Sequence, residues 1–150
     1  IILYKLQLYN NTVFSYFNIL FKNKMPVLVK KSLEIIKNEL SSMEFIAIVI
    51  FGSYAEGKQK EKSDLDIAIF VDSVEYQKTC ELAMKSAELK SILQLDYHII
   101  TKDEMLQMLK DKHENLGKQI AYKHIAVQNT RIFYGILEEG INNGFKIVYS

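Results

Sequence analysis

Hydrophobic residues in this chain form short unbroken runs, and longer amphipathic stretches separate them. Residues 45–51 read FIAIVIF, a run that is too short for a typical helix and is rich in β-branched and aromatic side chains. This run therefore predicts a strand that is buried on both faces. Residues 64–71 and 92–100 predict two further strands, and the short apolar run at residues 125–127 would add an edge strand.

The stretches between these runs have the spacing and the terminal signals of helices. Asp72 and Ser73 offer a cap for the helix that follows them, and Thr101 and Glu104 fit a capping box. Gly140 and Gly144 are expected to end the last helix. Because strands and helices alternate, the sequence predicts an α/β (α+β) fold in which helices cover a small β-sheet. The expected helices cover residues 26–42, 74–91, 101–109, further pieces from residue 116, and about 129–139.

The candidate functional residues lie at the end of the first predicted strand and at the start of the second. Gly52 has no side chain to keep a phosphate away from the backbone, and Ser53 adds a hydroxyl beside its own N–H. If a helix begins near Tyr54, its free N–H groups would point at the same anion. Asp64 and Asp66 are two residues apart in the second predicted strand, so both carboxylates point to one face, with their roots about 7 Å apart. Two such charges repel each other unless a cation lies between them, and Mg2+ prefers oxygen ligands of this kind.

A third carboxylate lies in the next predicted strand. Asp96 stands between Leu95 and Tyr97, and burying a carboxylate in an apolar strand is unfavourable unless it is paired, hydrogen-bonded or metal-bound. The alternative is an ordinary surface carboxylate on an edge strand. His98 shares the face of Asp96 by alternation, and it is either a substrate contact or simply a polar strand residue.

These residues resemble the signature of the DNA polymerase β-type nucleotidyltransferase superfamily, and the size is similar to its minimal nucleotidyltransferase (MNT) branch. The resemblance rests on Gly52 and Ser53, the gap that follows, and Asp64 and Asp66, and it spans roughly residues 26–101. It implies a nucleotidyltransferase fold with a small mixed sheet. It also implies that Gly52 and Ser53 contact a nucleoside triphosphate (NTP) and that both aspartates bind divalent metal. The third metal-binding carboxylate would be Asp96, and in the polymerases of this superfamily the corresponding carboxylate helps to deprotonate the attacking hydroxyl.

Residues 52–59 also fit most of a phosphate-binding P-loop. The final position fails, because Gln59 stands where a Ser or Thr must place a hydroxyl on magnesium. The charged residues 58–62 lead to a strand rather than to a clear helix, which the P-loop requires. We therefore do not expect a P-loop.

The N-terminal part reads differently from the rest. The chain opens with Ile1 rather than methionine, so we expect a processed product or a piece of a longer protein. Residues 1–25 predict a strand and a short helix, either a packing arm or the end of a winged-helix DNA-binding module. Residues 26–150 would form the nucleotidyltransferase domain with its C-terminal helices.

Composition narrows the classes of protein. The chain has 150 residues, 49% of them hydrophobic, which suits one globular domain with a core. A net charge of +1 lacks the electrostatic footprint of a dedicated nucleic-acid binder, although a local basic patch stays possible. The lone Cys80 fits a reducing, cytoplasmic location, and polar residues interrupt the N-terminal apolar clusters, so we expect no membrane span.

Together these features predict a metal-dependent nucleotidyltransferase that moves a nucleoside monophosphate from an NTP, with ATP favoured, to a hydroxyl. Two Mg2+ ions would lie between Asp64, Asp66 and Asp96. The acceptor is a protein or a nucleic acid, and a second protein or a homodimer mate would complete the cleft. The MNT resemblance implies a HEPN-type partner, for which this chain would be the antitoxin. The rival hypotheses are an antitoxin that binds its partner without catalysis, and a DNA-binding regulator.

Overall fold

A mixed four-stranded sheet forms the centre of the protein. The computed structural model describes residues 25–147. The strands are β1 (Ala47–Ile50), β2 (Leu65–Val71), β3 (Leu95–Thr101) and β4 (Ile125–Gln128), in the spatial order β3-β2-β1-β4. Strand β1 runs antiparallel to β2 and β4, whereas β2 and β3 are parallel. The predicted α/β (α+β) fold with a small mixed sheet is therefore confirmed.

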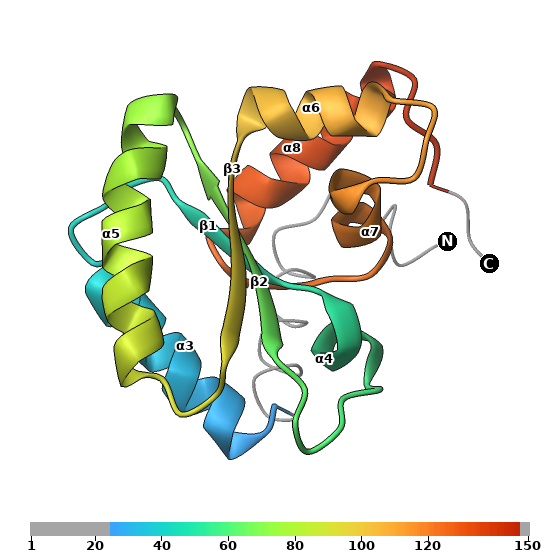
Figure 1. Ribbon diagram of the computed structural model, residues 1–150. Coiled ribbons are helices and arrows are strands. Elements are labelled where there is room, and N and C mark those ends of the chain that lie inside the picture. The colour runs from blue at the N-terminus through green and yellow to red at the C-terminus, as the bar shows by residue number, and fades with distance from the viewer. Residues whose placement is uncertain (1–24, 148–150) are drawn as a thin grey trace.

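Helices cover both faces of this sheet (Figure 1). One apolar core lies between the sheet and helices α3 and α5, and a second lies between the sheet and helices α6, α7 and α8. The short helix α4 follows β1 directly and packs near β2. The helices are α3 (Val27–Glu39), α4 (Gly52–Glu56), α5 (Val74–Lys90), α6 (Lys102–Lys110), α7 (Leu116–Tyr122) and α8 (Thr130–Asn142).

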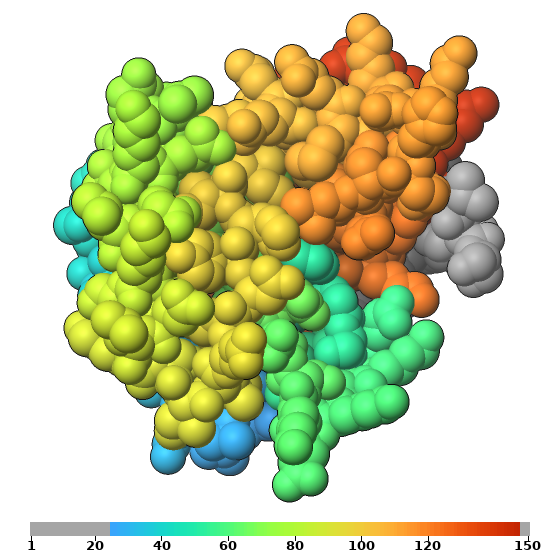
Figure 2. Space-filling view, in the orientation of Figure 1, coloured from blue at the N-terminus to red at the C-terminus, as the bar shows by residue number. Residues whose placement is uncertain are grey.

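Alternation along β2 assigns each side chain to one of the two cores. Ile67 and Ile69 belong to the core under α3 and α5, whereas Ala68 and Phe70 belong to the core under α6, α7 and α8. Asp66 is two residues before Ala68, so its side chain lies on the face of the sheet that α6, α7 and α8 cover, near the start of the strand. In Figure 2 the loop after α4, in green, projects beside β3 in yellow and α7 in orange.

Several predicted element boundaries are wrong by a few residues. Strand β1 begins at Ala47, because Phe45 has a left-handed backbone with φ of 57° and cannot continue a strand. Strand β3 begins at Leu95 rather than at residue 92. Helix α8 continues through Gly140, which lies in close contact with Leu109 of α6. The packing of two helices, rather than the end of one, explains this glycine.

Other local predictions are confirmed. Ser73 caps α5 by accepting a hydrogen bond from the N–H of Tyr76, and Thr101 and Glu104 form the expected capping box of α6. Strand β4 pairs only with β1 within the described residues, so it is an edge strand. The predicted N-terminal arm at residues 1–25 lies, apart from Met25, outside the described residues. Within residues 25–147, no helix combines the length and the apolar character that crossing a membrane requires.

Candidate active site

The turn after β1 brings the backbone against a carboxylate of β2. Gly52 starts α4 with φ of +63°, a conformation that side chains other than glycine rarely adopt. A Cβ atom at this position would lie 2.0 Å from Oδ2 of Asp66. The N–H of Phe51 donates to the backbone oxygen of Asp66 at 3.1 Å, which joins the end of β1 to the start of β2. The missing side chain of Gly52 therefore makes room for the Asp66 carboxylate.

Ser53 and Asp96 complete the immediate surroundings of Asp66. The backbone N–H of Ser53 hydrogen-bonds the Asp66 carboxylate. The parallel register of β2 and β3 pairs Asp66 directly with Asp96, so the two aspartates are neighbours across the strands. Asp64 lies two residues before Asp66, immediately before β2 begins. The structure thus gathers all five predicted site residues around one end of β2.

The charge of Asp66 is unfavourable in this position. Burial is the main cause that raises its pKa, and the neighbouring carboxylates of Asp96 and Asp64 raise it further. The N–H of Ser53 and the nearby His98 lower the pKa, but the net shift stays upward. A cation at this position would relieve the repulsion that raises the pKa.

His98 lies next to Asp96 on the same face of β3. Its Nε2 is 3.5 Å from Oδ1 of Asp96, and its ring is 5.9 Å from the ring of Phe51 between centroids. The Asp96 carboxylate stays accessible, with 56% of its side chain exposed. His98 is therefore connected both to the third carboxylate and to the end of β1, which its position in the sequence only partly indicated.

The chemistry of the donor set fits magnesium. Asp64, Asp66 and Asp96 offer carboxylate oxygens only, the ligands that Mg2+ prefers, and the Asp66 carboxylate fills the space that the missing side chain of Gly52 leaves. In the part of the chain that the structure describes, however, no group of at least three His, Cys, Asp or Glu side chains is arranged to hold a metal ion. His124 is engaged elsewhere, with its ring nitrogens bonded to Ile120 and Tyr134.

The loop after α4 does not have the form of a P-loop. Gly57 ends α4 after five residues with φ of 69°, and Lys58 makes an ion pair with Glu56 at 3.3 Å. The chain then continues through a turn into β2 instead of a long helix. The expectation that no P-loop is present agrees with this geometry.

A contact between α4 and the end of α7 could not be read from the sequence. Lys123, directly after α7, forms an ion pair with Glu56 at 3.0 Å. Lys123 and then Lys58 lower the pKa of the Glu56 carboxyl. No local spacing connects residues so far apart in the chain, and an exposed lysine gives no signal by itself. The contact joins the short helix that begins at Gly52 to the second helical layer.

Comparison with known proteins finds a family that matches most of this chain. Residues 29–126 match the family model described as "Nucleotidyltransferase domain", and this segment contains all five predicted site residues. Three proteins of Methanocaldococcus jannaschii, each named "Putative protein adenylyltransferase", are similar to the chain. The first is 39% identical over 79 residues, which are 51% of this chain and 88% of that protein. The second is 41% identical over 56 residues, 37% of this chain and 56% of that protein. The third is 36% identical over 63 residues, 42% of this chain and 66% of that protein.

A solved structure is also similar, more distantly. It is titled "Crystal structure of the toxin-antitoxin with AMP-PNP", and it shares 19% sequence identity with this chain at a TM-score of 0.47. The similarity covers 73% of this chain and 84% of the other.

Proposed function

The chain belongs to the nucleotidyltransferase domain family, and from that premise we propose that it transfers AMP from ATP to a hydroxyl group of a protein, releasing pyrophosphate. The names of the similar archaeal proteins support both the adenylyl donor and the protein acceptor. The family assignment agrees with the minimal nucleotidyltransferase predicted from the residues around Gly52 and Asp66.

One observation carries the proposal. The Asp66 carboxylate occupies the space where a side chain of Gly52 would lie, with the Ser53 N–H bonded to it and Asp96 beside it on the next strand. A backbone turn and a group of carboxylates are thereby within reach of one ligand. A triphosphate with its cations is a ligand that needs both.

Asp64, Asp66 and Asp96 would hold the metal, for which we propose two Mg2+ ions. When bound, magnesium would neutralise charge on the carboxylates and on the phosphates during transfer. The upward shift in the pKa of Asp66, caused by burial and by Asp96, supports a cation at this position.

The chain's own residues would position the reactants. Gly52 would present its backbone N–H to the triphosphate, and the side-chain hydroxyl of Ser53 adds a further donor, while the Ser53 N–H holds the Asp66 carboxylate. Asp96 lies opposite Asp66 on the neighbouring strand, and its side chain is exposed. It would accept the proton of the attacking hydroxyl. The hydroxyl oxygen then forms a bond to the α-phosphorus, and the bond from that phosphorus to pyrophosphate breaks.

A protein partner would supply the acceptor hydroxyl. We propose a partner of the HEPN type and a cytoplasmic location, as the MNT resemblance implies. A homodimer mate is the other means of completing the cleft.

Labelling with α-labelled ATP tests the proposal. The parent protein, Mg2+ and a lysate of the source organism should yield a labelled protein, whereas Asp64→Asn and Asp66→Asn should reduce labelling by at least about a hundredfold. Asp103→Asn is the matched control, because it removes the charge of an exposed aspartate in the first turn of α6. It should leave labelling unchanged.

Circular dichroism would show that each variant remains folded. Undiminished labelling by the folded Asp66→Asn protein would contradict the proposal. A partner that is captured equally by the parent and by both variants, with no labelling by any of them, would favour the non-catalytic binding module instead.

A further inference from the structure

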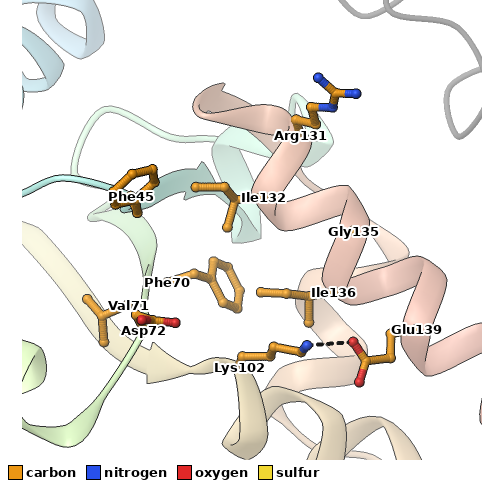
Figure 3. A pocket seen from close by; sticks show the side chains of 10 residues that line it. All are labelled: Phe45, Phe70, Val71, Asp72, Lys102, Arg131, Ile132, Gly135, Ile136 and Glu139. Atoms are coloured by element: carbon orange, nitrogen blue, oxygen red, sulfur yellow. Dashed lines mark ion pairs between the residues drawn. The ribbon is translucent and has the colours of Figure 1, made fainter.

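A hollow lies at the other end of the sheet from the aspartates. It has a volume of about 490 Å³ and lies between α8, Phe45 ahead of β1, the end of β2 and the start of α6 (Figure 3). Strand β2 runs from Leu65 to Val71, so Asp66 is near its beginning, whereas the hollow is lined by Phe70, Val71 and Asp72. A volume of this size is within the range of small-molecule sites.

Phe45 lines this hollow in an unusual conformation. It has φ of 57°, a left-handed backbone that is a genuine outlier for a bulky residue, and its side chain is exposed, at 72% for the residue. The neighbouring Ile46 accepts a hydrogen bond from Nδ2 of Asn129 at 2.6 Å. Asn129 is the other non-glycine residue of the described chain with positive φ. The strained backbone of Phe45 therefore places an aromatic ring at the surface, where burial does not stabilise it.

Gly135 lines the same hollow from α8. Glycine is unfavourable inside a helix relative to alanine, and a Cβ atom at Gly135 would have nothing within 4 Å. Gly117 and Gly140 differ, since a Cβ atom there would lie 2.6 Å from atoms of Met108 and Leu109, respectively. Close helix packing explains those two glycines. Gly135 has no such explanation within the described residues, and it leaves bare backbone facing open space.

Polar groups surround an apolar floor formed by Phe70, Ile132 and Ile136. Lys102 is paired with Glu139 at 2.6 Å along one side. Arg131 lies one turn before Gly135, and its guanidinium extends outward at the rim (Figure 3). Neither Arg131 nor Asp72 makes a hydrogen bond or ion pair with another residue in the part of the chain that the structure describes. An unpaired cation is thus available beside an exposed aromatic ring, and the Asp72 carboxylate attracts Lys102 electrostatically without a hydrogen bond to it.

We propose that this hollow is a second ligand site and that it binds a nucleoside monophosphate. The base would lie on the apolar floor, stacked against Phe45 and against the bare backbone at Gly135. Asp72 would accept hydrogen bonds from the ribose hydroxyls, and Arg131 would bind the phosphate at the rim, where it stays hydrated. This site is separate from the aspartates and does not depend on the proposed transfer activity.

Isothermal titration of the full chain with AMP in EDTA tests the site. EDTA removes divalent ions from the aspartate end, so the proposed triphosphate site is disabled. Gly135→Leu should fill the space over the helix backbone and weaken AMP binding by at least about tenfold. Phe45→Ala should weaken it by about tenfold through lost stacking, and Arg131→Gln should weaken it and reduce its dependence on salt.

Two further variants serve as controls. Gln119→Leu adds the same side chain to an exposed position of α7 away from the hollow, and it should bind AMP as the parent does. Asp66→Asn should also retain AMP binding, even though we expect it to abolish labelling. Thermal unfolding would verify that Gly135→Leu remains folded, and Arg131→Gln provides a test that does not alter the helix packing.

Three results would overturn the site. The first is a parent protein that binds no AMP. The second is equal affinity in the parent, Gly135→Leu and Arg131→Gln. The third is binding that is lost in Asp66→Asn but retained in Gly135→Leu, which would assign the nucleotide to the aspartate end.

Discussion

A glycine lies beside each end of the sheet, and the space left by its missing side chain is used differently at the two ends. At the aspartate end, a Cβ atom on Gly52 would lie 2.0 Å from Oδ2 of Asp66. At the opposite end, a Cβ atom on Gly135 would meet nothing within 4 Å. The protein's own carboxylate thus occupies the space at Gly52, whereas the space at Gly135 is open to a molecule from outside.

This difference separates two reasons for a glycine that look identical in a sequence. Gly52 serves the internal geometry of a site, because Asp66 can approach the backbone only where no side chain intervenes. Gly135 serves neither a turn nor helix packing, and it makes α8 less favourable than alanine would. Substitutions at the two positions should therefore have opposite effects on stability.

The largest effect is expected from Gly52→Ala. The positive φ alone should reduce stability by about 1–3 kcal/mol, and the new Cβ atom must also displace the Asp66 carboxylate. We expect reduced stability in urea unfolding together with loss of ATP labelling.

Gly57→Ala is the matched control for this substitution. Gly57 also has positive φ, +69°, but nothing lies within 4 Å of its Cβ position. It should lose stability through the backbone alone and retain labelling. If Gly52→Ala and Gly57→Ala lose the same amount of stability and both retain labelling, displacement of the Asp66 carboxylate affects neither property.

A smaller and opposite effect is expected from Gly135→Ala. The helix gains a better helix former without any clash, so the free energy of unfolding should rise by about 0.5–1 kcal/mol. Urea unfolding measures the change. Gly140→Ala provides the contrast, because its Cβ atom would lie 2.6 Å from Cδ1 of Leu109 and should reduce stability. Loss of stability in Gly135→Ala would mean that the fold itself requires this glycine.

The smallest effect is expected from Asp66→Asn in metal-free buffer. The folded state raises the pKa of Asp66, chiefly through burial, so it binds the proton more tightly than the unfolded state does. The parent therefore loses stability as pH rises from the ordinary carboxyl range through this raised pKa. The asparagine variant does not titrate, so its melting temperature should exceed that of the parent near neutral pH.

The pH dependence distinguishes this cause from a general change in packing. The difference in melting temperature should shrink as pH falls below the ordinary range of an aspartate, because both side chains are then neutral. A difference that is constant from acidic to neutral pH would contradict the electrostatic explanation. Saturating Mg2+ should reverse the order near neutral pH, if the aspartates bind the ion as proposed.

Much of the local structure could be predicted because it depends on neighbouring residues. The capping box at Thr101 and Glu104, the cap at Ser73 and the β-rich run before Gly52 each follow from local chemistry. The predicted fold class and nucleotidyltransferase assignment are confirmed by the sheet and by the family match at residues 29–126. The predicted start of the first strand at Phe45 was wrong. Phe45 has a left-handed backbone, and the next residue, Ile46, accepts a hydrogen bond from Asn129, which is distant in the sequence.

The sequence by itself determined which side chains are candidates for the chemistry, since the glycine turn and the two spaced aspartates are short-range patterns with a known strand periodicity. Only the tertiary structure decided that Asp96 lies beside Asp66, because that depends on the register of two parallel strands. The same holds for the ion pair between Lys123 and Glu56 and for the hollow at Gly135. Contacts of this kind join residues that are far apart in the chain, and no local pattern encodes their distance.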